Sequence, residues 1–125
     1  MKLAIVGGGS TYTPELIDGF TRTGLPLSEV HLVDPNPDRL GPVAGMARRM
    51  LTRAGHPATV VPTTDLVAGV EDADAVLLQL RVGGQDTRRQ DETWPHEEHC
   101  IGQETTGPGG FAKALRTVPV VLEIA

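Results

Sequence analysis

The chain has 125 residues, with 11 Lys plus Arg against 16 Asp plus Glu and a formal net charge of −5. That length suits one domain, and an acidic chain without a run of Lys or Arg is not expected to bind nucleic acid. Its apolar runs are far shorter than the roughly 20 residues that span a bilayer, so no membrane segment is expected. The single cysteine, Cys100, has no internal disulfide partner, which favours a cytoplasmic location.

Short apolar segments alternate with helical patterns along the first 80 residues. Strands are predicted over residues 2–6, 29–34, 58–62 and 75–80. Helices are predicted over 14–22, 38–54, 65–70 and 110–124. The polar, Gly-rich stretch 81–109 is longer than most loops, and its residues 86–92 fit a helix that ends before Pro95.

This alternation predicts the α/β class, with a Rossmann-like, doubly wound parallel sheet in the order 3-2-1-4. A complete dinucleotide fold adds a fifth and a sixth strand, so we expect a truncated sheet whose fourth strand has an unpaired edge. The last helix is expected to pack through a set of apolar side chains, namely Phe111, Leu115, Val118, Val121 and Leu122.

The first candidate site is the segment GGGSTY, which follows the first strand directly. Gly7 and Gly9 fit the first two glycines of the dinucleotide motif, one for the tight turn and one for approach of the pyrophosphate. Tyr12 stands where the motif has its third glycine, and Ser10 and Thr11 offer hydroxyl donors to phosphate. The alternative is a glycine-rich turn without a ligand.

Asp34 ends the second strand, 25 residues after Gly9. A carboxylate at this place typically binds the ribose hydroxyls. Because its charge repels a 2′-phosphate, NAD is favoured over NADP, although Arg39 lies nearby in the sequence. Together with the glycine turn, Asp34 predicts NAD binding.

The second candidate site lies in residues 81–109, next to the position where such sheets bind ligands. Arg81, Arg88 and Arg89 suit phosphate recognition, or form a solvated charged surface. Glu104, just before the last helix, is either a helix cap or a catalytic group.

The segment HEEHC does not have the zinc-binding H-E-x-x-H spacing, so we assign no metal ligand. Cys100 is expected to be a small buried residue. His31 and His56 are expected to be structural.

The stretches IVGGGSTYTPELIDGF, RVGG, RRQDE and above all IGQETTGPGGFAKALRTVPVVLEIA together resemble glycoside hydrolase family 4, in particular its 6-phospho-β-glucosidase branch. The resemblance covers essentially all of residues 1–125 but only the N-terminal, dinucleotide-binding part of the family's chain. It implies hydrolysis of a phosphorylated disaccharide or glucoside by NAD-dependent oxidation at C3, elimination and water addition, with a divalent metal, usually manganese.

By position, the resemblance implies that Arg88 contacts the phosphosugar and that Glu104 supports a catalytic tyrosine. It also implies that Gly7 to Thr11 and Asp34 bind the cofactor. The family's metal ligands and tyrosine lie beyond Ala125, so the fragment is expected to be inactive alone and the whole enzyme to be a homo-oligomer. His99 replaces a glycine that is common in the family.

Two other functions are compatible with this sequence pattern. One is a fragment of an NAD-dependent hydroxy-acid dehydrogenase, because such enzymes share the same first half. The other is a stand-alone nucleotide-binding or interaction module that pairs through its sheet edge.

Overall fold

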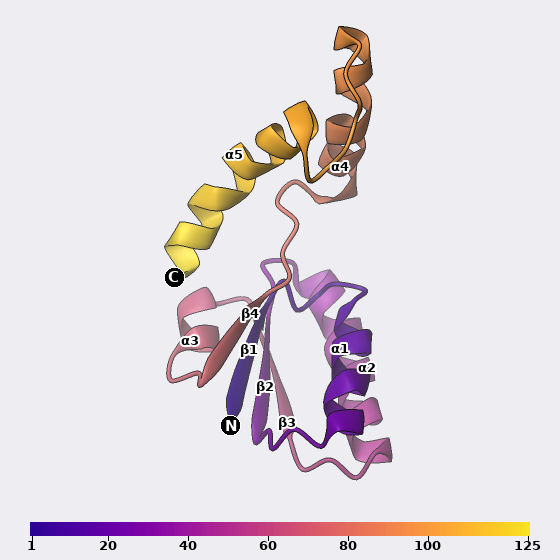
Figure 1. Cartoon of the computed structure of the whole chain (residues 1–125). Coiled ribbons are helices and arrows are strands. Elements are labelled where there is room, and N and C mark those ends of the chain that lie inside the picture. The colour runs from indigo at the N-terminus through magenta and orange to yellow at the C-terminus, as the bar shows by residue number, and fades with distance from the viewer. The chain divides into compact units, whose positions relative to one another are not determined.

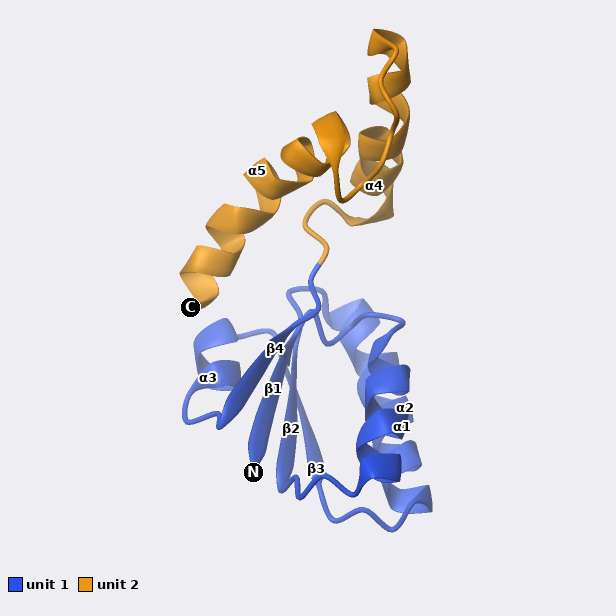
Figure 2. Ribbon diagram, viewed as in Figure 1, with its two compact units in different colours: residues 1–80 blue, residues 81–125 orange.

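The computed structural model describes residues 1–125 and contains two compact units, residues 1–80 and residues 81–125 (Figure 2).

The first unit is a four-stranded parallel sheet in the order β3-β2-β1-β4. Its strands are β1 (Lys2–Val6), β2 (Glu29–Val33), β3 (Thr59–Thr63) and β4 (Ala75–Leu78). Helices α1 (Thr13–Thr23) and α2 (Pro37–Arg53) cover one face, and α3 (Leu66–Val70) lies on the other (Figure 1). The predicted fold class and strand order are confirmed.

The core of this unit lies between the sheet and the two long helices. Alternate residues of β1 and β2 point into it, as the period of two in a strand requires. The cluster of buried apolar side chains comprises Leu3, Ile5, Ile17, Leu27, Val30, Leu32, Leu40, Ala44, Ala47, Leu51 and Val60. Met46 of α2 does not belong to this core and is 43% exposed.

The two edges of the sheet differ. Pro62 lies in the edge strand β3, where its missing N–H leaves no ladder bond unmade. At the same edge, Arg48 Nη2 of α2 donates to the carbonyl of Val60 at 3.0 Å. The edge strand β4 contains no proline, and no side chain donates to its carbonyl groups. Its Val76 and Leu78 are 40% and 44% exposed.

The helices begin and end at recognisable signals. Asn36 caps α2, because its Oδ1 accepts hydrogen bonds from the N–H groups of Asp38 and Arg39. Gly24 ends α1 in the left-handed conformation, with φ of 63°. Pro14 occupies the first turn of α1, where its missing N–H leaves no intrahelical bond unmade.

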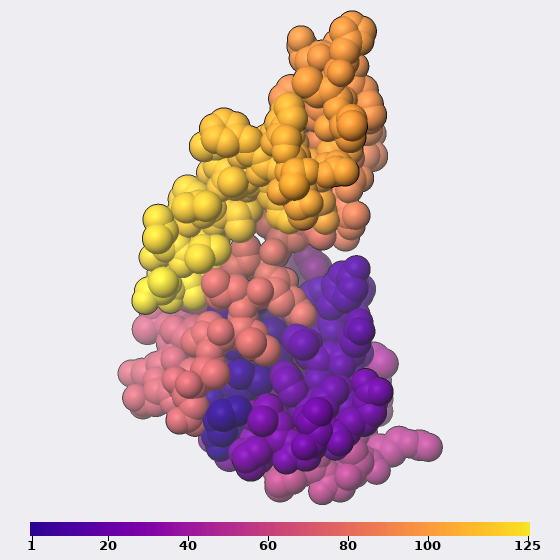
Figure 3. Space-filling view, in the orientation of Figure 1, coloured from indigo at the N-terminus to yellow at the C-terminus, as the bar shows by residue number.

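The second unit contains α4 (Gly84–Thr93), the 3₁₀ helix η1 (Trp94–Glu98) and α5 (Gly107–Ile124). The predicted helix over 86–92 is thus part of α4, which ends before Pro95 as expected. The packing predicted for α5 is wrong: Phe111, Leu115, Val118 and Leu122 are each more than half exposed. Side chains of α5 form part of the molecular surface (yellow in Figure 3).

The expectation for Cys100 is also wrong, because it is exposed after η1 instead of buried. Its neighbour His99 ends η1 in the left-handed conformation and is itself exposed, so Cys100 follows a turn at the surface and adds nothing to a core. None of the helices is both long and apolar enough to cross a membrane.

Candidate functional site: a glycine turn and an arginine–glutamate cluster

The turn after β1 requires its glycines. Gly7 has φ of +88°, and a Cβ there would lie 2.5 Å from the carbonyl oxygen of Gln79. The N–H groups of Gly7 and Gly8 both donate to the carbonyl of Val33, at 2.8 and 2.9 Å. The turn is therefore fastened to the ends of both neighbouring strands, β2 and β4.

Asp34 fixes the third glycine of this turn. Its Oδ2 accepts from the Gly9 N–H at 3.0 Å, and its Oδ1 accepts from the Asn36 N–H at 3.0 Å. A Cβ on Gly9 would lie 2.7 Å from Asp34 Oδ2. The carboxylate, 5% exposed, thus joins the glycine turn to the turn after β2. Each oxygen retains a second lone pair for a further donor.

Two polar side chains that were not predicted from the sequence, Thr13 and Gln79, complete this arrangement. Thr13 is fully buried, and its Oγ1 donates to the carbonyl of Gly8 at 2.9 Å. Gln79 Nε2 donates to Thr13 Oγ1 at 2.6 Å. Gln79 could have been found from the sequence, because it is the single polar residue of the apolar segment AVLLQL and lies near the carboxyl end of the predicted strand.

Ser10 and Thr11 lie just before α1, whose N-terminal cap residue is Tyr12. Ser10 Oγ accepts from the Tyr12 N–H at 3.2 Å, and Thr11 is exposed. The N-terminus of a helix carries partial positive charge and favours an anionic group. On the other side of the turn, Arg39 Nη2 reaches the carbonyl of Gly9 at 3.5 Å. The structure therefore brings together Gly7, Gly9, Ser10, Thr11 and Asp34 in one place.

In the second unit, three cations surround Glu104. Its carboxylate is hydrogen-bonded to Arg81 Nη1, and its Oε2 lies 3.5 Å from Arg88 Nε and 3.9 Å from Lys113 Nζ. The hydrogen bond from Arg81 holds the pKa of Glu104 below its ordinary value, and the charges of Lys113 and Arg88 act in the same direction against the effect of burial. Glu104 is therefore an ionised group, and not a cap of α5.

Arg88 has a second acidic partner. Its Nε donates to Glu92 Oε1 at 2.9 Å, one turn further along α4. The structure thus brings the two predicted residues Arg88 and Glu104 into one cluster. Arg81, a predicted phosphate-binding candidate, joins them, as does Lys113, which was not predicted from the sequence.

Glycines allow the segment that carries Glu104 to lie against α4. A Cβ on Gly102 would overlap the carbonyl oxygen of Glu92, and a Cβ on Gly109 would overlap that of Asp91. These close backbone approaches explain the glycines on both sides of Glu104 in GQETTGPGG. His99, by contrast, adopts φ of 56° without being glycine.

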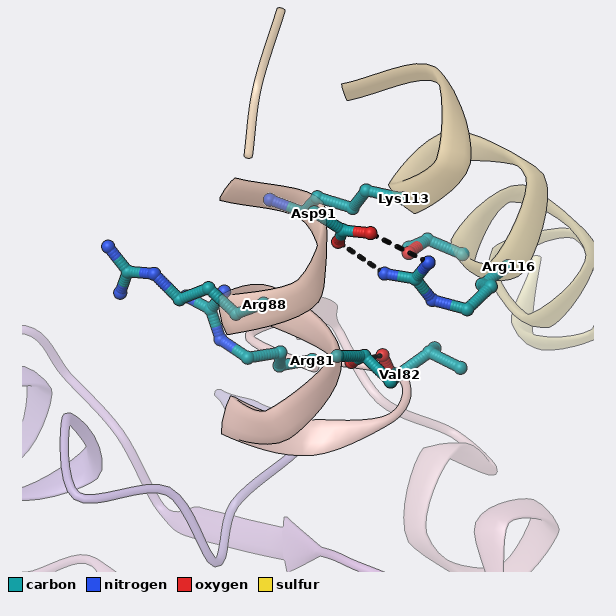
Figure 4. Close-up of a pocket in the computed structure, with 8 residues that line it drawn as sticks. Arg81, Val82, Arg88, Asp91, Lys113 and Arg116 are labelled. Atoms are coloured by element: carbon teal, nitrogen blue, oxygen red, sulfur yellow. Dashed lines mark hydrogen bonds and ion pairs between the residues drawn. The ribbon is translucent and has the colours of Figure 1, made fainter. Parts of the chain in front are cut away.

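A small pocket lies beside this cluster (Figure 4). Its lining is strongly cationic and comprises Arg81, Val82, Thr87, Arg88, Asp91, Lys113, Arg116 and Thr117. The two oxygens of Asp91 accept hydrogen bonds from the two terminal nitrogens of Arg116, as the dashed lines in Figure 4 show.

The histidines have other surroundings. His31 Nε2 lies 2.8 Å from Glu29 Oε2 within β2, and His56 Nε2 lies 2.9 Å from the carbonyl of Leu25. Neither histidine belongs to the glycine turn or to the Glu104 cluster, and their structural role stays a prediction. No group of three His, Cys, Asp or Glu side chains is arranged to hold a metal ion, and this includes the residues of HEEHC.

The first unit has the features of the doubly wound dinucleotide-binding class: a glycine turn between β1 and α1, and a carboxylate at the end of β2. Malate dehydrogenase from Plasmodium falciparum shares this fold, with a TM-score of 0.54, 18% identity and coverage of 70% of this chain and 27% of that one. Within that class, the profile of Family 4 glycosyl hydrolase matches residues 2–125, and the chain belongs to this family.

Relatives include a probable 6-phospho-β-glucosidase of Bacillus subtilis, 46% identical over 100% of this chain and 29% of that protein. The 6-phospho-β-glucosidase of Escherichia coli is 42% identical over 99% of this chain and 28% of that protein. This chain therefore spans less than a third of the length of these relatives.

Among solved structures, the 6-phospho-β-glucosidase of Thermotoga maritima with NAD and glucose-6-phosphate is 36% identical, with a TM-score of 0.91. The match covers 99% of this chain and 30% of that one. Another structure of that enzyme contains manganese, NAD⁺ and glucose-6-phosphate.

Proposed function

We propose that this chain is the nucleotide-binding part of an NAD- and metal-dependent 6-phosphoglycosidase, with 6-phospho-β-glucosides as the substrate class. The observation that carries the proposal is membership of the family, combined with a glycine turn held by Asp34 at the carboxyl ends of β1 and β2. Two of the relatives are named as 6-phospho-β-glucosidases, one of them as a probable one, and the structure of a third contains NAD and glucose-6-phosphate.

The residues of the first unit fit a dinucleotide. Ser10 and Thr11, at the positive end of α1, suit the pyrophosphate. Asp34 still has acceptor capacity for ribose hydroxyls, and its negative charge disfavours the 2′-phosphate of NADP. When bound, the nicotinamide supplies oxidation at a sugar carbon and later returns the hydride.

The cluster in the second unit fits an anionic sugar. Arg88 offers guanidinium donors to a phosphosugar, and Glu104 is an ionised carboxylate that supports neighbouring groups. We assign Glu104 a supporting role in catalysis and Arg88 a role in substrate binding.

A metal ion is part of this proposal on the basis of the relatives, one of whose structures contains manganese. The residues of this chain do not form a set of ligands for it. We therefore assign no ligand here and derive no step through the metal. A cytoplasmic location and a homo-oligomeric enzyme complete the proposal.

The first test is a calorimetric titration of the chain with NAD⁺, repeated with NADP⁺. We expect saturable binding with a clear preference for NAD⁺, and no binding to a folded sample would contradict the nucleotide site. The second test is hydrolysis of a 6-phospho-β-glucoside with NAD⁺ and Mn²⁺, first with the chain alone and then after adding the remaining part of a related enzyme. We expect activity only in the combined sample. Reduction of NAD⁺ by 2-hydroxy acids would instead favour a dehydrogenase.

A further inference from the structure

The ion pair between Asp91 and Arg116 has no part in the proposed reaction, yet it is the most buried charged contact of the second unit. Arg116 Nη1 donates to Asp91 Oδ1 at 3.0 Å, and the second terminal nitrogen bonds the other oxygen. The Asp91 side chain is only 4% exposed and that of Arg116 is 31% exposed. The pair connects α4 to α5 across 25 residues of sequence.

Each partner lies one helical turn from a member of the Glu104 cluster. Asp91 follows Arg88 by three positions on α4, and Arg116 follows Lys113 by three positions on α5. Residues three apart share one side of a helix. The two helices are therefore connected at two levels: directly by Asp91–Arg116, and through Glu104, which lies within 4 Å of Arg88 and Lys113.

A buried ion pair is a weak source of stability, because removing two charges from water costs about as much as their attraction returns. Apolar residues at the same positions would connect the helices at least as well. The pair instead fixes the relative orientation of the two side chains, because the planar guanidinium bonds both carboxylate oxygens in one geometry. Arg116 Nε, buried and without a partner, shows that the side chain is held by its terminal nitrogens alone.

We propose that Asp91 and Arg116 are positioning residues that hold α4 and α5 so that Arg88 and Lys113 meet at Glu104. This inference rests on the proposed roles of Arg88 and Glu104 in the substrate site. Its test uses the protonation of Glu104 as the readout, so that it stays interpretable whether or not the chain hydrolyses a phosphoglucoside.

The decisive variant is Arg116→Lys, which keeps the charge and removes the two-pronged contact. We expect the pKa of the Glu104 carboxyl, followed by NMR titration of its side-chain carbon and assigned with Glu104→Gln, to rise by about half a unit or more. The matched control is Arg89→Lys, the same substitution at an exposed position of α4, which should leave that pKa unchanged. An unchanged pKa in Arg116→Lys, with helix content retained, would overturn the proposal.

A second variant separates positioning from simple electrostatics. In Asp91→Asn a negative charge of the second unit disappears and the charge of Arg116 loses its partner, and both changes by themselves would lower the pKa of Glu104. Loss of positioning would raise it instead, so the two explanations predict opposite signs. We expect a rise, and a fall would overturn the proposal. Loss of helix content by circular dichroism in both variants would also overturn it, because the pair would then be needed for folding rather than for placement.

Discussion

At the scale of single residues, Asp34 has two tasks in the proposed function. It holds the Gly9 turn through one oxygen and the Asn36 turn through the other, and it is the candidate partner of the ribose. Both tasks depend on the same charge, because bonds to an ionised acceptor are stronger than bonds to a neutral one.

We therefore predict that Asp34→Asn weakens NAD⁺ binding by about tenfold, the effect of losing one charge-assisted hydrogen bond. The preference over NADP⁺ should narrow as well, because the carboxylate no longer repels the 2′-phosphate. Calorimetric titration with both nucleotides measures the change. Asp38→Asn, an exposed acid in the first turn of α2, is the control. Equal NAD⁺ affinities of Asp34→Asn and the parent chain would contradict the prediction.

His99 has an unfavourable backbone conformation. Its φ of 56° lies in the left-handed region, which costs a residue with a Cβ roughly 1–2 kcal/mol. A glycine at this position would adopt the same conformation without that cost, because it has no Cβ.

His99→Gly should therefore raise the free energy of unfolding of the second unit by about 0.5–1 kcal/mol, since part of the gain is lost to the greater freedom of unfolded glycine. Denaturant unfolding followed by the fluorescence of Trp94, the single tryptophan, reports on this unit. His96→Gly, within η1 and without a positive φ, is expected to be destabilising. A lower free energy of unfolding in His99→Gly would contradict the prediction that His99 is strained.

At the scale of elements, Glu104 connects α4 and α5 to the segment between them. Its pKa lies below the ordinary value of 4.5 in the folded chain. As the pH is lowered, the Glu104 carboxyl therefore takes up its proton at a higher pH in the unfolded chain than in the folded chain. The free energy of unfolding decreases as the pH falls below 4.5. The stabilisation is complete above pH 4.5 and is lost as the pH falls through the lowered pKa.

Glu104→Gln should accordingly reduce the stability of the second unit at neutral pH and flatten its dependence on pH below 4.5. Denaturant unfolding monitored by Trp94 fluorescence at a series of pH values measures both effects. Glu97→Gln, an exposed acid of η1, should retain the pH dependence of the parent chain. Identical pH profiles for Glu104→Gln and the parent chain would show that the three cations do not stabilise the carboxylate.

At the scale of the whole molecule, the two units differ in how they are stabilised. All the buried apolar side chains of the main core belong to residues 3–60. The second unit buries Asp91, Pro95 and Gly109, and relies on ion pairs and close backbone contacts. Burial of apolar surface stabilises a fold more than ion pairs do, so we expect the first unit to be more stable than the second.

We expect hydrogen exchange to separate the units. Amides of β1 and β2 should exchange only through global unfolding of the first unit, whereas amides of α5 should exchange faster by at least tenfold through local opening. Exchange followed by NMR or mass spectrometry at neutral pH measures the difference. Equal protection of α5 and β1 would contradict the prediction.

The sequence by itself determined the fold of the first unit, because its signals are local. Each apolar segment, with a turn after it, predicted one strand, and parallel pairing with right-handed crossovers left the order that the structure shows. The spacing of Gly7, Gly9 and Asp34 predicted one candidate site for the same reason, since the carboxyl ends of neighbouring parallel strands lie together.

Only the tertiary structure decided the contacts between residues distant in the chain. The bond of Gln79 to Thr13 spans 66 positions, and that of Arg116 to Asp91 spans 25. The packing of α5 could not be predicted from its periodicity. A helical pattern shows which side chains share a face, but not whether another element covers that face. The cations around Glu104 belong to three separate segments, and only folding brings their charges close enough to lower the pKa of its carboxyl.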